Sequence, residues 1–255
     1  MAKNNTVGVI PARMGSSRFP GKPIELILGQ SMIYHVWQRA RLSGVLDRII
    51  IATCDEEIRK TAVKFGAEVM MTSSEHEVSN DRIAEVASRV DCQIILNIQG
   101  DEPLVHPQLI ADVIREFARN PSIQCVNPTS PLTTDEERQS SHTVKVVSNL
   151  QNRVVYFSRY PIPSDLVNPR SYPVMRQVPI LGFRRDFCIR LAELPPGPLE
   201  MQEGIDLLRA IEHDLPVHAM ETKFQTFGVD TERDRQIVEE RMRSDETYPR
   251  YTDAK

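Results

Sequence analysis

The chain reads TVGVIP at residues 6–11 and continues directly into PARMGSSRFPGKP at residues 11–23. The first run is short and rich in β-branched residues, which predicts a buried strand. The loop after it carries two glycines that allow backbone shapes closed to other residues, two serine hydroxyls, and the cations Arg13, Arg18 and Lys22. A basic, glycine-bearing loop directly after a strand predicts a binding site for polyphosphate.

This loop matches neither of two common phosphate-binding signatures. It lacks the spacing G-x-x-x-x-G-K-[ST] of the P-loop and the G-x-G-x-x-G of dinucleotide-binding proteins. The alternative interpretation is a rigid surface turn. Basic residues at the carboxyl end of a strand favour the functional interpretation, because ligands of parallel sheets bind there.

Three further apolar runs are each followed by a helical pattern with one apolar face. The predicted strands are residues 6–11, 48–53, 67–71 and 93–99, and the helical stripes after them run through residues 33–40, 58–65, 83–90 and 110–117. Continuous apolar strands alternating with helices predict an α/β fold with a mainly parallel sheet flanked by helices. The loops at residues 11–23, 53–57 and 99–103 should therefore meet in one crevice beyond the strand ends.

The pattern changes from about residue 125 to residue 185. Strand-like runs without helices between them predict a smaller antiparallel β insertion there, at residues 143–147, 153–157 and 178–183. Helical patterns return at residues 186–193 and 201–212, a last strand is expected at residues 217–221, and a charged helix follows GVDT. We expect a single domain over residues 1–255 that contains this insertion.

Two glycine-turned aspartates follow predicted strands. NIQGDEP (97–103) presents Asp101 and Glu102 after the fourth strand, one of which could hold Mg²⁺, and FGVDT (227–231) presents Asp230 after the last strand. Hard carboxylate oxygens on converging loops suit Mg²⁺ that also binds phosphates. A solvated acidic turn is the alternative for each of them.

Composition limits the classes of partner. The formal charge of −4 gives no general attraction to nucleic acid or to an anionic membrane. No apolar stretch approaches the roughly 18 residues of a membrane helix, and the first apolar run is too short for a signal peptide, so we expect a cytoplasmic protein. The four cysteines and six histidines lack the spacing of metal ligands, which leaves small, reduced and buried thiols as the expectation.

Several of these stretches together resemble one enzyme family, the CMP-Kdo synthetases or 3-deoxy-manno-octulosonate (Kdo) cytidylyltransferases. The motifs that carry the resemblance occur in the same order over essentially the whole chain: PARMGSSRFPGKP, SNDRIAEV, NIQGDEP, VKVV, YFSR and GVDT. The resemblance implies a nucleotidyltransferase with a Rossmann-like fold that transfers CMP from CTP to an acidic sugar and releases pyrophosphate. It also implies Mg²⁺ as cofactor and a homodimer formed through the β insertion.

The resemblance also implies roles for individual residues. It assigns Arg13 and Lys22 to the triphosphate and Asp101 and Asp230 to Mg²⁺, and these four form the expected catalytic group. The expected CTP-binding set is Pro11, Ala12, Arg13, Ser17, Lys22, Ser79, Asn80, Arg82 and Gln99. The expected acceptor-binding set is Gln99, Arg159, Gln177, Arg184 and Asp206.

The chain departs from the family pattern at three places. The family's S-G-T-D-R is VSNDR at residues 78–82, its H-L-G-I-Y-[AG]-Y-R is QVPILGFR at residues 177–184, and its L-E-Q-L-R is IDLLR at residues 205–209. Loss of several hydroxyl-binding partners of the sugar predicts an acceptor other than Kdo, such as a modified ulosonic acid or a small phosphonate like phosphonoformate. The alternative is neutral drift within a genuine Kdo enzyme.

Other interpretations remain open at this point. A non-catalytic CTP-binding regulator would keep the loop and lose the chemistry, and a sugar-1-phosphate nucleotidylyltransferase would use a similar loop. The apolar alternation of Val144 with Val146 and of Val154 with Tyr156 leaves one face of the insertion to be covered. We expect a second copy of the chain to cover it, although packing on its own domain would also suffice.

Overall fold

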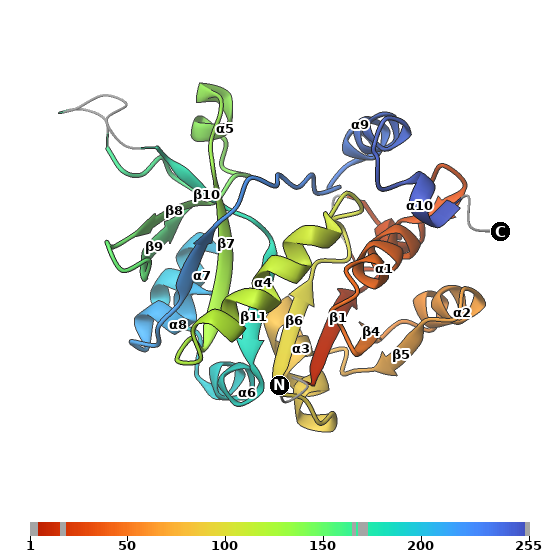
Figure 1. The fold of residues 1–255 in the computed structure, drawn as a ribbon, viewed down its shortest axis with the longest axis horizontal. Coiled ribbons are helices and arrows are strands. Elements are labelled where there is room, and N and C mark those ends of the chain that lie inside the picture. Colours follow the sequence, from red (N-terminus) through yellow and green to blue (C-terminus); the bar gives the residue numbers. More distant parts are fainter. Residues whose placement is uncertain (1–4, 16–18, 165–166, 168–172, 253–255) are drawn as a thin grey trace.

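One mixed sheet of ten strands runs through the molecule (Figure 1). The structure, a computed structural model, describes residues 5–15, 19–164, 167 and 173–252. The strand order is β5-β4-β1-β6-β11-β7-β10-β8-β9, with β12 paired to β7. The strands are β1 (Thr6–Ala12), β4 (Arg48–Thr53), β5 (Glu68–Met71), β6 (Ile94–Ile98), β7 (Cys125–Pro131), β8 (Lys145–Ser148), β9 (Val154–Ser158), β10 (Met175–Gln177), β11 (Ile180–Arg184) and β12 (His218–Glu221). A separate small hairpin pairs β2 (Leu26–Ile27) with β3 (Gln30–Ser31).

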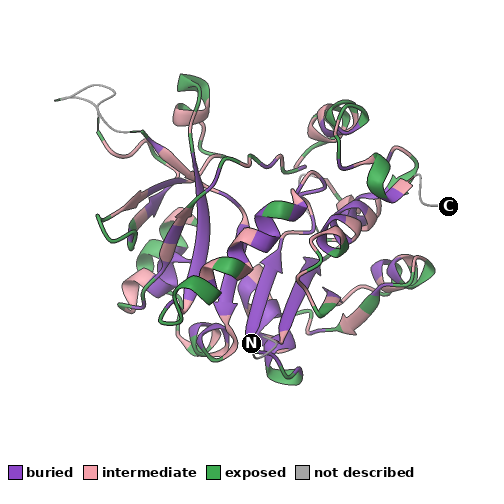
Figure 2. Cartoon of the chain, viewed as in Figure 1, coloured by how far each residue is buried: buried purple, intermediate pink, exposed green. Residues whose placement is uncertain are grey.

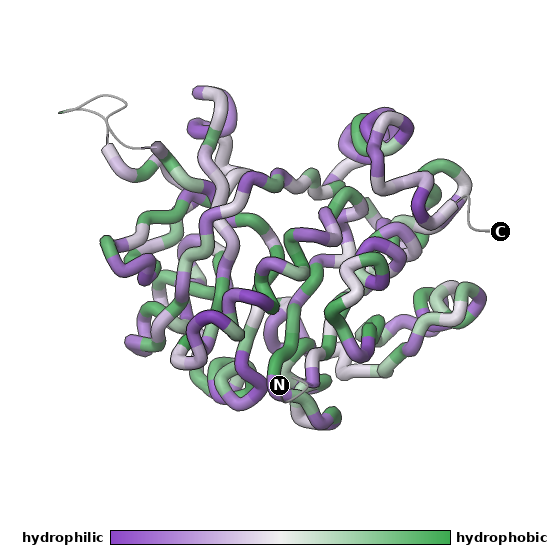
Figure 3. Tube along the Cα trace, in the orientation of Figure 1, coloured by the Kyte–Doolittle hydropathy of each residue, from purple (hydrophilic) through white to green (hydrophobic). Residues whose placement is uncertain are grey.

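Helices cover both faces of this sheet. They are α1 (Met32–Leu42), α2 (Glu56–Lys64), α3 (Ser79–Arg89), α4 (Pro107–Arg119), α5 (Asp135–Gln139), α6 (Arg185–Glu193), α7 (Pro198–Glu203), α8 (Leu208–Glu212), α9 (Glu232–Arg243) and α10 (Pro249–Thr252), with a 3-10 turn η1 at Lys22–Ile24. Alternate residues of β1 face opposite sides, so that Val9 packs with Ile83 of α3 and Ile10 packs with Val36 of α1. The central strands are accordingly buried and apolar, and exposed polar residues lie on the outer helix surfaces (Figures 2 and 3).

The predicted α/β class and its four strand–helix units are confirmed. The strands β5, β4, β1 and β6 are parallel neighbours, and each is followed by a helix along the chain. Their registers pair Ala12 with Thr53 and Val9 with Asn97, which brings the carboxyl ends of the strands to one edge. This edge carries the loops in which the sequence predicts a phosphate site.

The segment from residue 125 to residue 185 forms no sheet of its own. Its strands continue the main sheet, because β11 pairs antiparallel with β6, and β7, β10, β8 and β9 follow. No pattern in the sequence predicts β7, which contains two prolines. Pro128 is tolerated in this central strand because β7 changes partner there, from β11 at Val126 to β10 at Thr129. The predicted helix at residues 201–212 is divided in two, and Gly204, with φ 62°, ends α7.

No helix within the described residues is both long and apolar enough to cross a membrane.

Candidate active site

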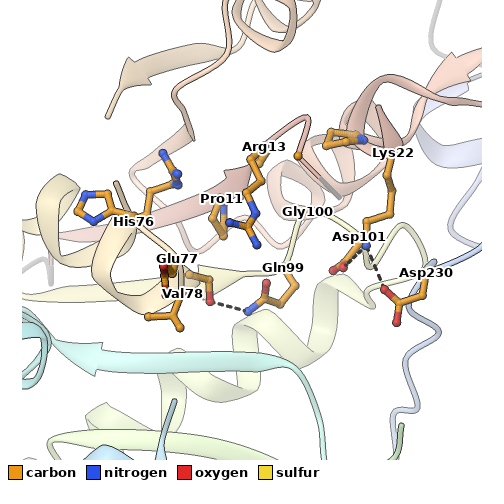
Figure 4. Close-up of a pocket in the computed structure, with 15 residues that line it drawn as sticks. Pro11, Arg13, Lys22, His76, Glu77, Val78, Gln99, Gly100, Asp101 and Asp230 are labelled. Atoms are coloured by element: carbon orange, nitrogen blue, oxygen red, sulfur yellow. Dashed lines mark hydrogen bonds and ion pairs between the residues drawn. The ribbon is translucent and has the colours of Figure 1, made fainter. Parts of the chain in front are cut away.

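A cavity of about 460 Å³ lies beyond the carboxyl ends of the parallel strands, and we call it the strand-end cavity (Figure 4). Nine of its lining residues belong to the predicted site: Pro11, Ala12, Arg13, Lys22, Ser79, Arg82, Gln99, Asp101 and Asp230. Of the other six, Gly15, Pro23 and Gly100 lie in loops predicted to meet there, whereas His76, Glu77 and Val78 belong to no predicted site. Ser17, also predicted, lies outside the described residues. Segments more than 200 residues apart in the chain thus meet in a cavity of the size that small ligands need.

The basic loop after β1 is held at its start and at its end. The backbone N–H of Met14 donates to Asp55 Oδ2 at 2.8 Å, and Asp55 is in turn fixed by its N–H bond to Thr53 Oγ1 at 3.0 Å. Gly21 has φ 76°, a conformation that favours glycine, and its N–H donates to the Met14 carbonyl. The side chain of Arg13, in contrast, is exposed toward the cavity.

Gly100 allows the turn that presents Asp101. A Cβ atom at Gly100 would lie 2.6 Å from the carbonyl oxygen of Pro11, closer than real Cβ contacts. Only glycine lets the loop after β6 pass so close to the backbone of β1. The backbone contact therefore brings the acidic loop against the start of the basic loop.

Asp230 is positioned by the start of α9 and by the loop of Asp101. Thr231 and Asp234 form a reciprocal capping box, and Asp234 Oδ2 also accepts the N–H of Asp230 at 3.1 Å. The N–H of Val229 donates to the Asp101 carbonyl at 2.9 Å. This backbone bond joins the two aspartate-bearing loops.

Both carboxylates meet the ammonium group of Lys22. Lys22 Nζ lies 2.7 Å from Asp101 Oδ2 and 3.3 Å from Asp230 Oδ1, as the dashed lines in Figure 4 show. Burial by itself lowers the pKa of Lys22, but its ion pairs with the two aspartates outweigh that effect, and the pKa is raised above its ordinary value. The two acidic side chains thus direct oxygens at one cation.

The same two carboxylates fit Mg²⁺. They are hard oxygen donors, they are 35% and 42% exposed, and their oxygens already converge on one positive group. No cluster of three or more His, Cys, Asp or Glu suited to a metal occurs within the described part of the chain. Mg²⁺ is often bound by one or two protein carboxylates with phosphates completing its coordination, and this pair suits such a site.

The prediction that Glu102 is presented at the crevice beside Asp101 is wrong, because its side chain is buried and does not line the strand-end cavity. Burial raises the pKa of the Glu102 carboxyl well above its usual range, and the nearby negative charge of Asp101 adds to this shift. A Cβ on Gly228 would lie 3.0 Å from Glu102 Oε1, so the glycine of GVDT makes room for this buried carboxyl. The side chain of Glu102, on the loop of Asp101, thus packs against the loop that carries Asp230.

The hydroxyl of Ser79, the first residue of α3, accepts hydrogen bonds from two side-chain amides beside the strand-end cavity. Ser79 Oγ accepts bonds from Gln99 Nε2 at 3.1 Å and from Asn97 Nδ2 at 3.0 Å. Asn80 does not line the cavity, and its Oδ1 accepts a second bond from Asn97 Nδ2 at 2.9 Å behind it. Ser79 and Gln99 are thus hydrogen-bonded to each other at the cavity. Asn80 lies behind them and supports Asn97, which also binds Ser79.

The end of the cavity opposite Asp230 is formed by the loop between β5 and α3 (Figure 4). His76 Nε2 lies 2.5 Å from Glu85 Oε2. Arg82 is buried, donates to Thr72 Oγ1 and the Ser73 carbonyl, and still lines the cavity. The missed residues His76, Glu77 and Val78 could have been found by treating the loop after every parallel strand as a candidate.

Two arginines of the predicted acceptor set lie outside the lining of the strand-end cavity and donate to backbone carbonyls. Arg159 donates to the backbone carbonyls of Glu203, Ser141 and Gly204, and does not line the strand-end cavity. Arg184 pairs with Ile94 at the beginning of β6, the far end of that strand from Gln99. The guanidinium of Arg184 donates there to three carbonyls, those of Phe117, Pro121 and Ile123.

The other two members of the acceptor set also lie outside the cavity lining. Gln177 is on β10 opposite Thr129. Burial raises the pKa of Asp206 to about 6, and the negative charge of Glu200 contributes to the shift. Of the predicted acceptor residues, the structure brings only Gln99 to the strand-end cavity.

Comparisons with known proteins give consistent matches over nearly the full chain. The family described as Cytidylyltransferase matches residues 7–222. The 3-deoxy-manno-octulosonate cytidylyltransferase of Syntrophotalea carbinolica is 39% identical over 243 residues, which cover 92% of this chain and 97% of that protein. The protein of the same name from Geobacter sulfurreducens is 38% identical over 250 residues, covering 94% and 100%. A solved structure of a CMP:2-keto-3-deoxy-manno-octonic acid synthetase complexed with CTP has a TM-score of 0.89 and 33% identity, and covers 94% of this chain and 98% of that one.

Proposed function

The chain belongs to the cytidylyltransferase family, in its CMP-Kdo synthetase branch, and we propose that it transfers CMP from CTP to a small acidic acceptor with release of pyrophosphate. One observation carries this proposal for the chain itself. The strand-end cavity gathers the cations Arg13, Lys22 and Arg82 with the carboxylates Asp101 and Asp230. This combination suits a triphosphate bound together with a divalent cation.

The residues of the cavity can perform nucleotidyl transfer by binding and orientation. An acceptor oxygen forms a bond to the α-phosphorus of CTP while the bond from that phosphorus to the departing pyrophosphate breaks. Arg13 and Lys22 offset negative charge on the phosphates, and the loops of the cavity hold the reactants in line. When bound at Asp101 and Asp230, Mg²⁺ supplies further positive charge to the same phosphates.

A covalent intermediate on cysteine is not part of this proposal. The thiols of Cys92, Cys125 and Cys188 are buried, and Cys54 does not line the strand-end cavity. Burial raises the pKa of Cys92 to about 11, so that this thiol stays protonated at neutral pH. Direct transfer between bound substrates remains the simplest chemistry.

The acceptor we propose is an anionic acid with fewer hydroxyl contacts than Kdo, such as a modified ulosonic acid or a small phosphonate like phosphonoformate. Leu181, which stands where the family resemblance expects tyrosine, is buried and pairs with Asn97 across β11 and β6. Asn97 Oδ1 is buried without a side-chain or backbone partner in the described structure. An apolar residue beside an unpaired amide oxygen is consistent with loss of the tyrosine hydroxyl that the family resemblance expects at residue 181.

Kdo itself is the second candidate, because the relatives with 38–39% identity are named for that substrate. Incubation with CTP, Mg²⁺ and one acid at a time, with pyrophosphate release as the readout, separates the candidates. The proposal expects faster turnover at low acid concentration with another acid of the panel than with Kdo. Efficient turnover with Kdo alone would establish the second candidate, and release only with a sugar phosphate would contradict both.

The face of the insertion that carries Val146 and Val154 is buried in the chain's own core and needs no second copy to cover it. We propose instead a homodimer formed through the β8–β9 end of the sheet. β9 is the last strand in the sheet order, and Leu150, Val155, Tyr160 and Met201 are large apolar residues exposed in this region. Their exposed fractions are 96%, 55%, 79% and 69%. Exposed apolar side chains at the end of a sheet are suited to burial against a second copy of the chain. Light scattering at micromolar concentration should give twice the chain mass for the wild type and the mass of one chain for Val155→Lys, and a monomeric wild type would contradict the dimer.

A further inference from the structure

The contacts of Lys22 set it in competition with a metal ion. Its Nζ atom contacts Asp101 Oδ2 at 2.7 Å and Asp230 Oδ1 at 3.3 Å, the same two carboxylates that the proposed function assigns to Mg²⁺. An ammonium group and a divalent cation repel each other, so Lys22 opposes a metal that would use these same two oxygens. Binding of one therefore weakens binding of the other.

Lys22 cannot leave these carboxylates without a replacement partner. Its side chain is only 12% exposed, so an unpaired ammonium there would be largely removed from water. Breaking such a pair leaves an uncompensated charge, which is unfavourable. Weak metal binding is therefore expected as long as no other anion reaches Lys22.

Triphosphate can be that other anion. Lys22 lines the strand-end cavity together with Arg13, on the basic loop. Its flexible four-carbon stem can turn its charge toward a phosphate while the backbone of η1 stays fixed. Asp101 Oδ2 and Asp230 Oδ1 then lose the ammonium contact that opposes a metal.

We propose that Lys22 is a placeholder, meaning that its ammonium occupies the Asp101–Asp230 pair and blocks divalent cations there. When CTP binds, its phosphates draw the ammonium away, so that the binding of CTP is coupled to the binding of the metal. This inference rests on the proposed role of the aspartates as metal ligands. Metal and nucleotide then bind with positive cooperativity, and by linkage each raises the affinity for the other by the same factor. Lys22 acts here as a positioning residue for the metal as well as a phosphate ligand.

Mn²⁺ binding to the full chain without nucleotide tests the placeholder directly, because bound Mn²⁺ loses the EPR signal of the free ion. Lys22→Met should bind Mn²⁺ at least tenfold more tightly than the wild type. Lys64→Met on α2 removes the same charge from an exposed lysine and should bind as the wild type does. Adding Asp101→Asn to Lys22→Met should abolish the gain.

A second measurement separates this inference from the proposed function. Equilibrium dialysis of CTP against the wild type, with and without Mn²⁺, should show at least tenfold tighter CTP binding with the metal. If Mn²⁺ strengthens CTP binding but Lys22→Met binds the free metal no better than the wild type, Lys22 is not the barrier. Tight Mn²⁺ binding by the nucleotide-free wild type, lost in Asp101→Asn, would also overturn the placeholder and leave the metal site intact.

Thermal unfolding checks that the variants are folded. If Lys22→Met does not fold, Lys22→Gln takes its place, and the wild-type measurements decide independently. If Mn²⁺ changes CTP affinity in no form of the protein, the metal assignment is wrong, and the placeholder falls with it.

Discussion

Gly100 shows how one residue can determine the geometry of the site. Gly100→Ala would place a Cβ 2.6 Å from the Pro11 carbonyl, a backbone atom that cannot turn away. We expect the variant to lose about 1–3 kcal/mol of unfolding free energy. Displacement of the Asp101 loop should lower kcat by roughly tenfold to hundredfold.

Urea denaturation and steady-state pyrophosphate release measure the two effects of Gly100→Ala. Gly15→Ala is the matched control for stability, because nothing lies within 4 Å of a Cβ there. Equal stability of the two variants would show that the β6 loop is not constrained by β1.

Arg159, predicted to bind the acceptor, makes several hydrogen bonds that give it a structural role as well. Its guanidinium donates to the carbonyls of Glu203, Ser141 and Gly204, and its own carbonyl accepts from the buried Lys145. Arg159→Ala should therefore lower the free energy of unfolding by about 2 kcal/mol and leave CTP affinity unchanged. Arg153→Ala, which removes a surface pair with Asp214, should cost less than half of that in the same denaturation experiment. A rise in acceptor KM with no loss of stability would instead restore the role that the sequence predicted.

At the scale of elements, the buried His35 of α1 connects the β2–β3 hairpin with the C-terminal helix α10 through hydrogen bonds. His35 Nε2 donates to the Ile27 carbonyl at 2.8 Å, so Nδ1 is left to accept from the hydroxyl of Tyr251 at 2.9 Å. Burial lowers the pKa of His35 to about 4, and the charge of Arg39 acts in the same direction. The folded protein therefore keeps this ring neutral at pH values where the unfolded chain protonates it.

This histidine should make the protein sensitive to acid. Because the folded pKa lies below the unfolded value near 6.5, stability should be constant above about pH 6.5 and fall by about 3 kcal/mol down to pH 4. His35→Gln should be less stable at pH 7 and lose less on acidification, as measured by denaturation at a series of pH values. His213→Gln, at a solvent-exposed hydrogen bond, is the control. The same pH slope in all three proteins would contradict the buried neutral ring.

Whether a strand could be predicted depends on whether its local sequence or its tertiary pairing makes it a strand. β1, β4, β5 and β6 could be predicted because each is a run of apolar or β-branched residues followed by a one-sided helix. β7 could not, because its residues CVNPTSP carry prolines and a buried asparagine, and its hydrogen bonds are supplied by partners distant in sequence. Tertiary pairing, and not local preference, makes that segment a strand.

At the scale of the whole molecule, the parallel sheet explains why much of the site was predictable. Loops after parallel strands share one edge, so Arg13, Gln99 and Asp101 meet once the strands are recognised. Arg184 could not be located in the same way. Its position follows from the antiparallel register of β11 on β6, which no pattern in the sequence specifies.

In the proposed function, the strand-end cavity performs cytidylyl transfer through Asp101 and Asp230. The most direct measurement is the initial rate of pyrophosphate release from CTP as a function of Mg²⁺ concentration, with the best acid of the panel as acceptor. Asp101→Asn and Asp230→Asn should each lose at least about a hundredfold of the metal-dependent rate while remaining folded, because a charged oxygen ligand is replaced by an amide of equal size. Asp214→Asn, whose carboxylate is 96% exposed on the surface, should retain the wild-type rate. Normal Mg²⁺-dependent rates in Asp101→Asn and Asp230→Asn, or no pyrophosphate release by the wild type with any acid, would contradict the account.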